Sequence, residues 1–198
     1  MIFEFCSKRA RSLILIPLVF AIANNAMAGD IFGVTVPDTV NVANQELKLN
    51  GAGVRTKFSS KYAVASLYLR EPKATTEEII AEPGPKRLSE VLMQSSTADR
   101  FAEGFMSGMR NNASKDERTK VVLSMLKFGQ IFSAISDVKK GDIWSADWVP
   151  GTGIVFQVNG KQAGEAINDP LFYSMFLRIW LGDHPLDSTL KRTLLNGH

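Results

Sequence analysis

The side chains that most often carry enzyme chemistry are scarce in this sequence of 198 residues. It has two histidines, His184 and His198, and the second is the last residue of the chain. A Ser–His–Asp triad would have to use His184, and no nucleophile-elbow pattern accompanies that residue. The single cysteine, Cys6, lies close to the start, so a zinc site built from cysteines and histidines is not expected. The inventory therefore predicts neither a nucleophilic triad nor a metal centre.

A glycine-rich stretch also fails to indicate a cofactor. Gly51-x-Gly53 has the spacing that opens a dinucleotide-binding fingerprint, but position 56 is Thr56 where that pattern requires glycine. The element expected next is a strand, whereas the fingerprint leads into a helix. We therefore expect no cofactor.

The first 28 residues have the pattern of a secretory signal peptide. Lys8, Arg9 and Arg11 precede an apolar run over residues 13–23, and Ala26-Met27-Ala28 is a small-x-small cleavage pattern. The run has 11 residues, whereas a helix that crosses a bilayer needs roughly 20. We expect cleavage after Ala28, with an uncleaved membrane anchor as the alternative. The mature domain would span residues 29–198 and work in the periplasm or outside the cell.

Cleavage would change the charge and the redox chemistry of the chain. It would remove Cys6, three basic residues and Glu4, which leaves 20 basic and 19 acidic residues. A domain so close to neutral does not indicate nucleic-acid binding, which needs a concentrated basic face. No later apolar stretch is long enough to span a bilayer, so we expect no stable membrane insertion. About 170 residues without repeats predict one domain with a single core.

The first half of this domain reads as strands. The best candidate covers residues 62–69, where Tyr62, Val64, Ser66 and Tyr68 would share one face, opposite apolar residues. Both faces are largely apolar, so this strand should be central. Three further strands are expected over residues 31–36, 46–50 and 86–94.

Helices are expected next, and strands then return. Thr97 can cap a helix that runs to about Asn112, and a second helix should start near Ser114 and continue to about residue 135. The apolar stripes of both helices indicate packing on the sheet rather than a cofactor box. Further elements follow: strands at 142–148, 153–158 and 161–166, a helix at 169–181 and a short helix from 187. This order predicts the α+β class with a mostly antiparallel sheet.

Three segments together resemble the chalcone isomerase family, in particular its bacterial exported branch. The first is Leu49–Arg55 (LNGAGVR), which is similar to the family's GAGVR-like turn, and Lys61–Leu69 (KYAVASLYL), which is similar to the strand that follows it. The second is Pro150-Gly151-x-Gly153 with the Asn159-Gly160 hairpin, and the third is Tyr173–Lys191 with its Ile-Trp-Leu-Gly stretch. The resemblance covers essentially the whole mature chain. It implies an open-faced β-sandwich, in which a large curved antiparallel sheet is covered by a layer of helices.

The resemblance also implies a site. The family keeps an apolar cleft between sheet and helices, which holds a flavonoid precursor in plant chalcone isomerases and a fatty acid in related plastid proteins. The arginine of the GAGVR segment, matched here by Arg55, points into that cleft. From the residues alone, Arg55 could equally lie exposed at a strand end and pair with a nearby acid. Inside a cleft its guanidinium would need a partner, for which a ligand carboxylate is well suited. The expected site residues are Arg55, Tyr62, Tyr68, Phe101, Phe105, Met109, Phe172, Met175 and Phe176, with the two tyrosines equally interpretable as ordinary sheet aromatics.

The polar groups that serve catalysis in the family are not matched. Phe101, Gly108 and Ile179 align near the positions of its tyrosine, asparagine and late-helix hydroxyl residue, and Ala63 replaces its central-strand threonine. The resemblance thus leaves three hypotheses. The first is a non-catalytic binder of a small apolar acid, such as a fatty acid, anchored by Arg55. The second is a structural or partner-binding protein with a filled cleft, and the third an intramolecular lyase of the chalcone isomerase type.

Overall fold

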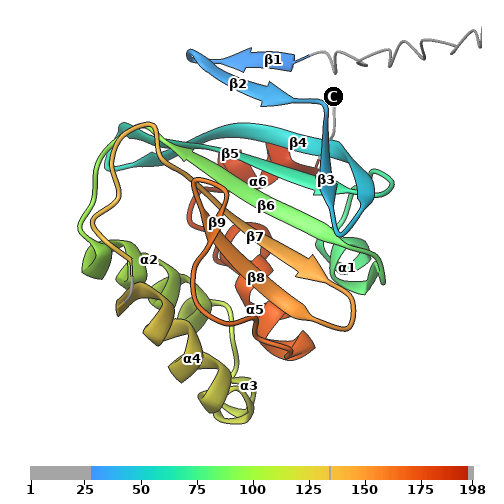
Figure 1. Ribbon diagram of the computed structural model, residues 1–198, viewed down its shortest axis with the longest axis vertical. Helices are drawn as coiled ribbons and strands as arrows, with labels where there is room; N and C mark the ends of the chain where they lie inside the picture. Colours follow the sequence, from blue (N-terminus) through green and yellow to red (C-terminus); the bar gives the residue numbers. More distant parts are fainter. Residues whose placement is uncertain (1–27, 134, 196–198) are drawn as a thin grey trace, which may run out of the picture.

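The computed structural model describes residues 28–133 and 135–195 and is built on one large sheet (Figure 1). Seven strands pair in sequence order, each antiparallel to its neighbours. They are β3 (Thr39–Val42), β4 (Gln45–Lys57), β5 (Ser60–Leu69), β6 (Lys86–Leu92), β7 (Ile143–Val149), β8 (Gly153–Val158) and β9 (Lys161–Gln162). The two strands β1 (Ala28–Ile31) and β2 (Val34–Pro37) form a separate hairpin.

Six helices complete the described chain. They are α1 (Thr76–Ala81), α2 (Ala98–Asn111), α3 (Lys115–Lys120), α4 (Val122–Ser133), α5 (Pro170–Leu181) and α6 (Ser188–Leu195). Figure 1 shows the β1–β2 hairpin at the top and helices α2 to α4 at the bottom, with the sheet between them. The α+β class and the curved antiparallel sheet covered by helices are confirmed. No helix of the described residues is long and apolar enough to cross a membrane.

The two faces of the sheet carry separate apolar clusters. The larger cluster joins α2, α4, α5 and α6 to the inward side chains of β5 to β8, among them Leu67, Leu88 and Trp144. The smaller cluster lies on the opposite face, where Val64 and Tyr68 pack with residues of β2, β3 and β4. The predicted central strand, β5, is therefore covered on both faces and is almost fully buried.

Several helix and turn predictions are confirmed by their capping contacts. Thr97 caps α2 and accepts a hydrogen bond from the Arg100 backbone N–H. Asp169 caps α5, with Pro170 in its first turn. Asn159 and Gly160 have φ values of 51° and 74°, as a type I′ turn between β8 and β9 requires.

Other predictions were wrong in their bounds. The expected strand at 31–36 is a hairpin that turns at Phe32-Gly33, because β2 folds back on β1. The expected strand at 161–166 ends at Gln162, although Ile167 still forms a bridge to Ile154. The helix expected from Ser114 is broken at Val121 into α3, which buries no residue, and α4. Strand β3 and helix α1 were not predicted.

The segment Gly51–Arg55, expected to be a turn, is the middle of the 13-residue strand β4. Its two glycines, Gly51 and Gly53, lie in close contact with helix α6. A Cβ atom on Gly51 would lie 2.8 Å from Leu194 Cα, and one on Gly53 would lie 3.2 Å from Thr193 Cβ. Real Cβ atoms essentially never approach a backbone atom as closely as 2.8 Å, and 3.2 Å to a side-chain carbon is already a tight contact, so the glycines allow α6 to lie directly on the strand.

Two bulges interrupt the pairing of β4 with β5, and the second explains a wrong face assignment. Leu49 pairs with Tyr68 and Gly51 with Leu67, so Asn50 is an extra residue on β4. Arg55 pairs with Ala63 and Thr56 with Lys61, so Tyr62 is an extra residue on β5. An extra residue shifts the alternation of side chains by one. Tyr62 consequently packs with the helical cluster, whereas Tyr68 belongs to the opposite face.

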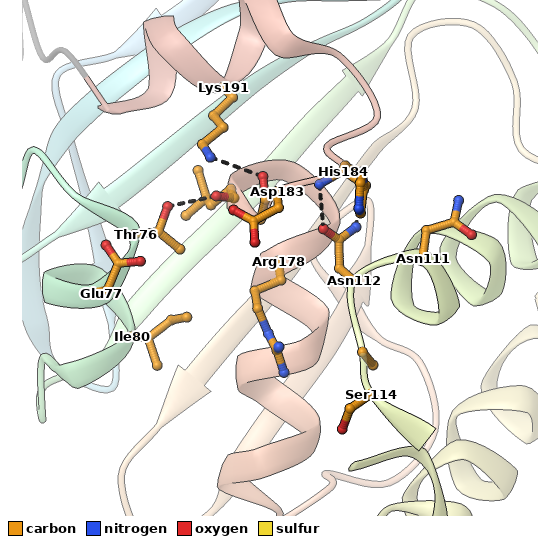
Figure 2. A pocket seen from close by; sticks show the side chains of 13 residues that line it. Thr76, Glu77, Ile80, Asn111, Asn112, Ser114, Arg178, Asp183, His184 and Lys191 are labelled. Carbon is orange, nitrogen blue, oxygen red and sulfur yellow. Dashed lines mark hydrogen bonds between the residues drawn. The ribbon is translucent and has the colours of Figure 1, made fainter. Parts of the chain in front are cut away.

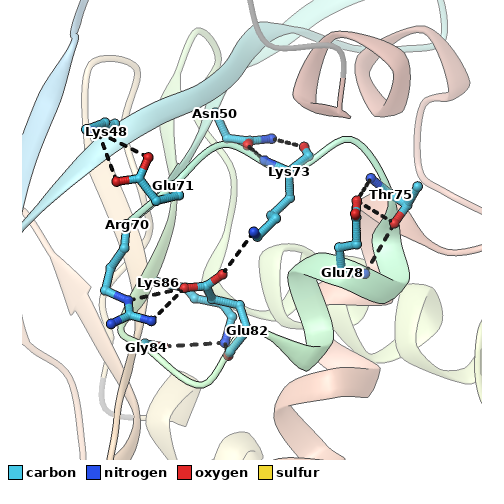
Figure 3. Close-up of polar contacts among 10 residues, drawn as sticks. All are labelled: Lys48, Asn50, Arg70, Glu71, Lys73, Thr75, Glu78, Glu82, Gly84 and Lys86. Carbon is cyan, nitrogen blue, oxygen red and sulfur yellow. Dashed lines mark hydrogen bonds and ion pairs between the residues drawn. The ribbon is translucent and has the colours of Figure 1, made fainter.

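The polar cluster around the first bulge fixes the loop that leads into α1 (Figure 3). The Asn50 side chain accepts a hydrogen bond from the Lys73 backbone N–H at 2.6 Å and donates one to the Lys73 carbonyl at 3.0 Å. Nearby, Glu82 pairs with Arg70 at 3.0 Å, and the buried Lys86 ammonium donates to the carbonyl oxygens of Glu82 and Gly84. Burial lowers the pKa of Lys86 to about 8.

Candidate functional site

The candidate site lies where β4 and β5 meet the start of helix α2. Arg55 and Tyr62, at the second bulge, lie together: the Arg55 Cζ atom is 4.2 Å from the centroid of the Tyr62 ring, in a cation–π contact. The Arg55 side chain is 11% exposed. Arg55 is therefore mostly buried, at the border of the crevice between β4, β5 and α2, and not exposed at a strand end.

Arg55 has an internal partner, a nearby acid as one of the two alternatives expected, although the sequence analysis did not identify it as Glu90. Its Nε lies 3.0 Å from Oε1 of Glu90, whose side chain is 0% exposed, although Nε is not aligned for a hydrogen bond to it. Two indole N–H groups donate to the same carboxylate, from Trp180 at 2.9 Å and from Trp144 at 3.2 Å. The expectation that Arg55 would depend on a ligand for its counter-charge was wrong, because Glu90 supplies that charge.

The sequence did contain a signal for Glu90. In β6, buried residues alternate with half-exposed ones, and the buried series is Lys86, Leu88, Glu90 and Leu92. The period of two that places the leucines inward places Glu90 inward as well. A buried acid needs a charged or hydrogen-bonding partner, so this alternation predicts one.

A small crevice opens beside Arg55. It has a volume of about 20 Å³, roughly the space of one water molecule. Lys57 and Arg100 add positive charge to its lining, and Gly104 leaves open space for a side chain on α2. The remaining lining is largely aromatic or aliphatic: Tyr62, Phe101, Phe105, Trp180 and Leu186. The crevice is thus a cationic opening with apolar walls.

The apolar chamber expected behind Arg55 is filled by its own lining. The six side chains expected to border it are at most 5% exposed: Phe101, Phe105, Met109, Phe172, Met175 and Phe176. Phe105 lies at the centre, with ring centroids at 4.9 Å from Phe101, 5.0 Å from Trp144 and 5.8 Å from Phe176. Of the six, only Phe101 and Phe105 border the crevice. The other four belong to the packed core in this form of the protein.

The second tyrosine lies elsewhere. Tyr68 is 2% exposed within the cluster on the opposite face of the sheet, and burial raises the pKa of its phenol. It cannot share a site with Arg55, because the sheet lies between them. The expectation that Tyr68 lines the same ligand site as Arg55 was therefore wrong.

Two of the four positions that the resemblance matches to catalytic groups lie beside Arg55 or the crevice, and the other two contact each other. Ala63 is the strand partner of Arg55, and Phe101 borders the crevice. Gly108 on α2 packs so tightly against α5 that a Cβ atom there would lie 2.7 Å from Ile179 Cγ2. None of the four side chains is polar, so none of them can donate a hydrogen bond or transfer a proton.

A larger hollow of about 400 Å³ lies at the carboxyl end of α5 (Figure 2). Its polar groups satisfy the last carbonyls of that helix: Thr76 donates to Leu181 O at 2.6 Å and Lys191 to Gly182 O at 3.0 Å. Asn112 donates to His184 O and accepts from His184 N. None of the expected site residues borders this hollow. Within the described residues there is also no group of three or more metal-ligating side chains.

Comparison with known proteins agrees with this architecture. No curated protein matches the chain. Among solved structures, a fatty-acid binding protein of Arabidopsis thaliana is similar, with a TM-score of 0.66 and 12% sequence identity. The match covers 86% of this chain and 96% of that one, and at this identity it shows a common fold. A family model described as chalcone isomerase-like matches residues 28–196. The chain therefore belongs to the chalcone isomerase-like family.

Proposed function

We propose that this protein binds a small apolar acid, of the fatty-acid type, without converting it. The observation that carries the proposal is the state of the Arg55 guanidinium. Its Nε lies 3.0 Å from Oε1 of Glu90, and neither Nη atom takes part in a hydrogen bond within residues 28–133 and 135–195. The planar fork is thus held in place at the crevice while its outer N–H groups remain free for two carboxylate oxygens.

The surroundings of the fork suit an apolar anion. Lys57 and Arg100 add positive charge at the crevice, which offsets the negative charge of Glu90 behind it. The walls offer rings and a leucine to the carbon chain next to the carboxylate. The shared fold with a protein whose name states fatty-acid binding supports the choice of ligand class.

The carbon chain requires side chains to move. A crevice of about 20 Å³ has no room for several methylene groups. Phe101 and Leu186 stand at its wall, and Gly104 offers open space between α2 and the crevice. Each methylene that becomes buried contributes ~0.8 kcal/mol, and this gain would drive the opening. Long-chain acids should consequently bind more tightly than short ones.

We expect no turnover of the chalcone isomerase type, because the positions that the resemblance matches to the family's polar catalytic groups are apolar. General acid–base catalysis needs a group that can exchange a proton within hydrogen-bond reach of the reacting atoms. Ala63, Phe101, Gly108 and Ile179 offer none, and Arg55 alone can hold an anion but cannot supply the remaining steps. We therefore expect no acceleration of chalcone cyclisation.

The test is a titration of delipidated protein with a long-chain acid and with the alcohol of equal length. The Arg55→Ala/Glu90→Gln double variant removes the guanidinium without leaving a buried unpaired carboxylate. Arg110→Ala, which removes an exposed guanidinium of α2 that does not border the crevice, serves as the control. The double variant should lose about 1.5–3 kcal/mol of binding free energy for the acid and much less for the alcohol. Equal affinities of the wild-type protein for acid and alcohol would show that Arg55 is not the anchor. Native mass spectrometry before and after organic extraction should detect a co-purified acid.

A second candidate function is favoured by a specific observation on helix α4. Its outward face exposes Val122, Leu123 and Leu126, which are 50%, 75% and 61% exposed. Together with the filled interior, this face suits a structural or partner-binding protein. If neither ligand binds the delipidated protein, this second function replaces the first.

We also propose that the protein is an exported one of the bacterial type. The signal-peptide pattern supports this, although residues 1–27 lie outside the described part of the chain. The family match begins at Ala28, the last residue of the expected cleavage pattern.

A further inference from the structure

Two hairpin turns of this protein place phenylalanine where the backbone disfavours it. Phe32 joins β1 to β2 with φ 53°, followed by Gly33 at 80°, and Phe58 joins β4 to β5 with φ 50°, followed by Ser59 at 63°. Turns with two positive φ values favour asparagine, aspartate or glycine, and a bulky residue there is an outlier. The β8–β9 turn of the same chain uses the favoured pair, Asn159-Gly160. Both phenylalanines are nevertheless exposed, Phe32 by 62% and Phe58 by 92%.

The two turns lie at one edge of the molecule and are flanked by lysines. The Lys61 Nζ atom is 3.2 Å from the centroid of the Phe32 ring, and Lys57 Nζ is 5.9 Å from the Phe58 ring. Lys57 and Lys61 belong to the strand ends on either side of the Phe58 turn. Figure 1 shows both turns at the left of the view. We call Phe32, Phe58, Lys57 and Lys61 the aromatic edge.

The aromatic edge is continuous with the mouth of the crevice. Lys57 borders the crevice beside Arg55, and its Nζ lies 5.7 Å from the Tyr62 ring. Leu186, which is 37% exposed, and Arg100 lie on the same opening. A surface held against the aromatic edge would therefore lie next to the entrance of the crevice.

We propose that the aromatic edge docks the protein on the surface of a lipid bilayer that contains anionic lipids. Aromatic side chains partition into the boundary between headgroups and acyl chains, and lysines beside them are attracted to anionic headgroups. The strained φ values are consistent with this role, because such strain persists in proteins where function requires it. Docking itself does not depend on the crevice, and only its purpose, the transfer of an apolar acid, rests on the proposed function.

The geometry favours a bilayer over a protein partner. A stable protein interface buries about 800 Å² on each side with a packed centre. The aromatic edge offers two separate rings at turn tips instead of a continuous apolar patch. Isolated rings with cations beside them can enter a fluid lipid surface without a complementary shape.

The test compares the binding of signal-processed protein to phosphatidylcholine vesicles with and without phosphatidylglycerol. The decisive variant is Phe32→Asn/Phe58→Asn, which should fold at least as well as the wild type because asparagine tolerates positive φ. The matched control is Leu123→Gln/Leu126→Gln, which removes two exposed apolar side chains from α4. We expect salt-sensitive binding to the anionic vesicles, weakened about tenfold or more in the asparagine variant and unchanged in the control.

Three outcomes would overturn the proposal. One is that the wild-type protein ignores anionic vesicles, and another is that only the α4 variant loses binding. The third is a concentration-dependent dimer that the asparagine substitutions abolish while vesicle binding is absent, which would make the aromatic edge a protein interface.

Titration of the long-chain acid in vesicle-free solution separates this proposal from the proposed function. The asparagine variant should keep the wild-type affinity for the acid, because its substitutions lie outside the crevice. If the wild-type protein binds vesicles but does not bind the acid, only the proposed function is refuted.

Discussion

Gly51 and Thr193 meet so closely that a methyl group on Gly51 would overlap the backbone carbonyl of Thr193. The contact joins the second strand of the large sheet to the last helix. Gly53, two residues further along β4, meets the side chain of the same threonine. The glycines of the GAGVR segment therefore provide close packing of a helix on a strand, and the arginine that follows is carried to the crevice by the same strand.

Gly51→Ala should destabilise the protein. Relief of the overlap with Thr193 and Leu194 requires α6 to move from the sheet, and overpacking of this kind costs about 1–3 kcal/mol or more. Gly129→Ala is the matched control, since a Cβ atom at Gly129 has nothing within 4 Å and the residue lies inside α4. That variant should gain about 0.5–1 kcal/mol. Urea unfolding measures the change in the free energy of unfolding for both variants. Equal changes would contradict the explanation that Gly51 is needed for the close contact with α6.

Glu90→Gln should be strongly destabilising. The substitution removes the only carboxylate paired with the Arg55 guanidinium among the described residues, and loss of one partner from a buried pair costs about 3–5 kcal/mol. In the Arg55→Met/Glu90→Gln double variant the loss should be smaller than the sum of the two single losses. A double-mutant cycle in urea measures this coupling, and additive losses would show that the pair is not coupled.

Lys86 should make stability depend on pH in the alkaline range. Burial lowers its pKa in the folded protein to about 8, below the ordinary value of 10.5. Between these values the unfolded chain binds more protons than the native protein, so stability rises with pH. Relative to Lys86→Met, the wild-type protein should gain about 1–3 kcal/mol between pH 8 and 10.5. Chemical denaturation of both proteins across this range tests the slope, and a difference that does not vary with pH would refute it.

Processing should occur after Ala28. Ala26 and Ala28 are the small residues that signal peptidases accept at a cleavage site, so the exported protein should begin at Gly29 in N-terminal sequencing. Ala28→Leu should block the cut. A wild-type product that retains Met1 in the membrane fraction would contradict this prediction.

Local capping signals made much of the fold predictable. The helix caps Thr97 and Asp169 bond to backbone N–H groups of their own helices, and Asn159-Gly160 adopts the positive φ values of its turn. These local contacts do not depend on where the element packs, so the sequence alone indicates them. The same logic could have found α1, because Thr75 and Glu78 form a capping box. The β1–β2 turn could not be found in this way, since Phe32 is not a residue that favours turns.

The site was less predictable because bulges and pairing decide it. Tyr62 and Tyr68 are six residues apart and would share a face in a regular strand, but the extra residue in β5 separates them. The pairing of Arg55 with Glu90 depends on strands that are not adjacent, so no spacing along the chain reveals it. The filled chamber depends on side-chain volumes, which a pattern of apolar residues does not fix.

The hydrogen bond from the Asn50 side chain to the Leu194 carbonyl spans 144 residues. The Asn50 amide at the β4 bulge and the neighbouring glycines make all of their contacts only when α6 lies on the strand. While the chain is being synthesised, β4 precedes α6, so the Asn50 amide lacks one of its acceptors and the surface of Gly51 and Gly53 is uncovered until α6 arrives. The packing of β4 is therefore completed only when α6 has docked on it, so the contacts of this strand form late in folding.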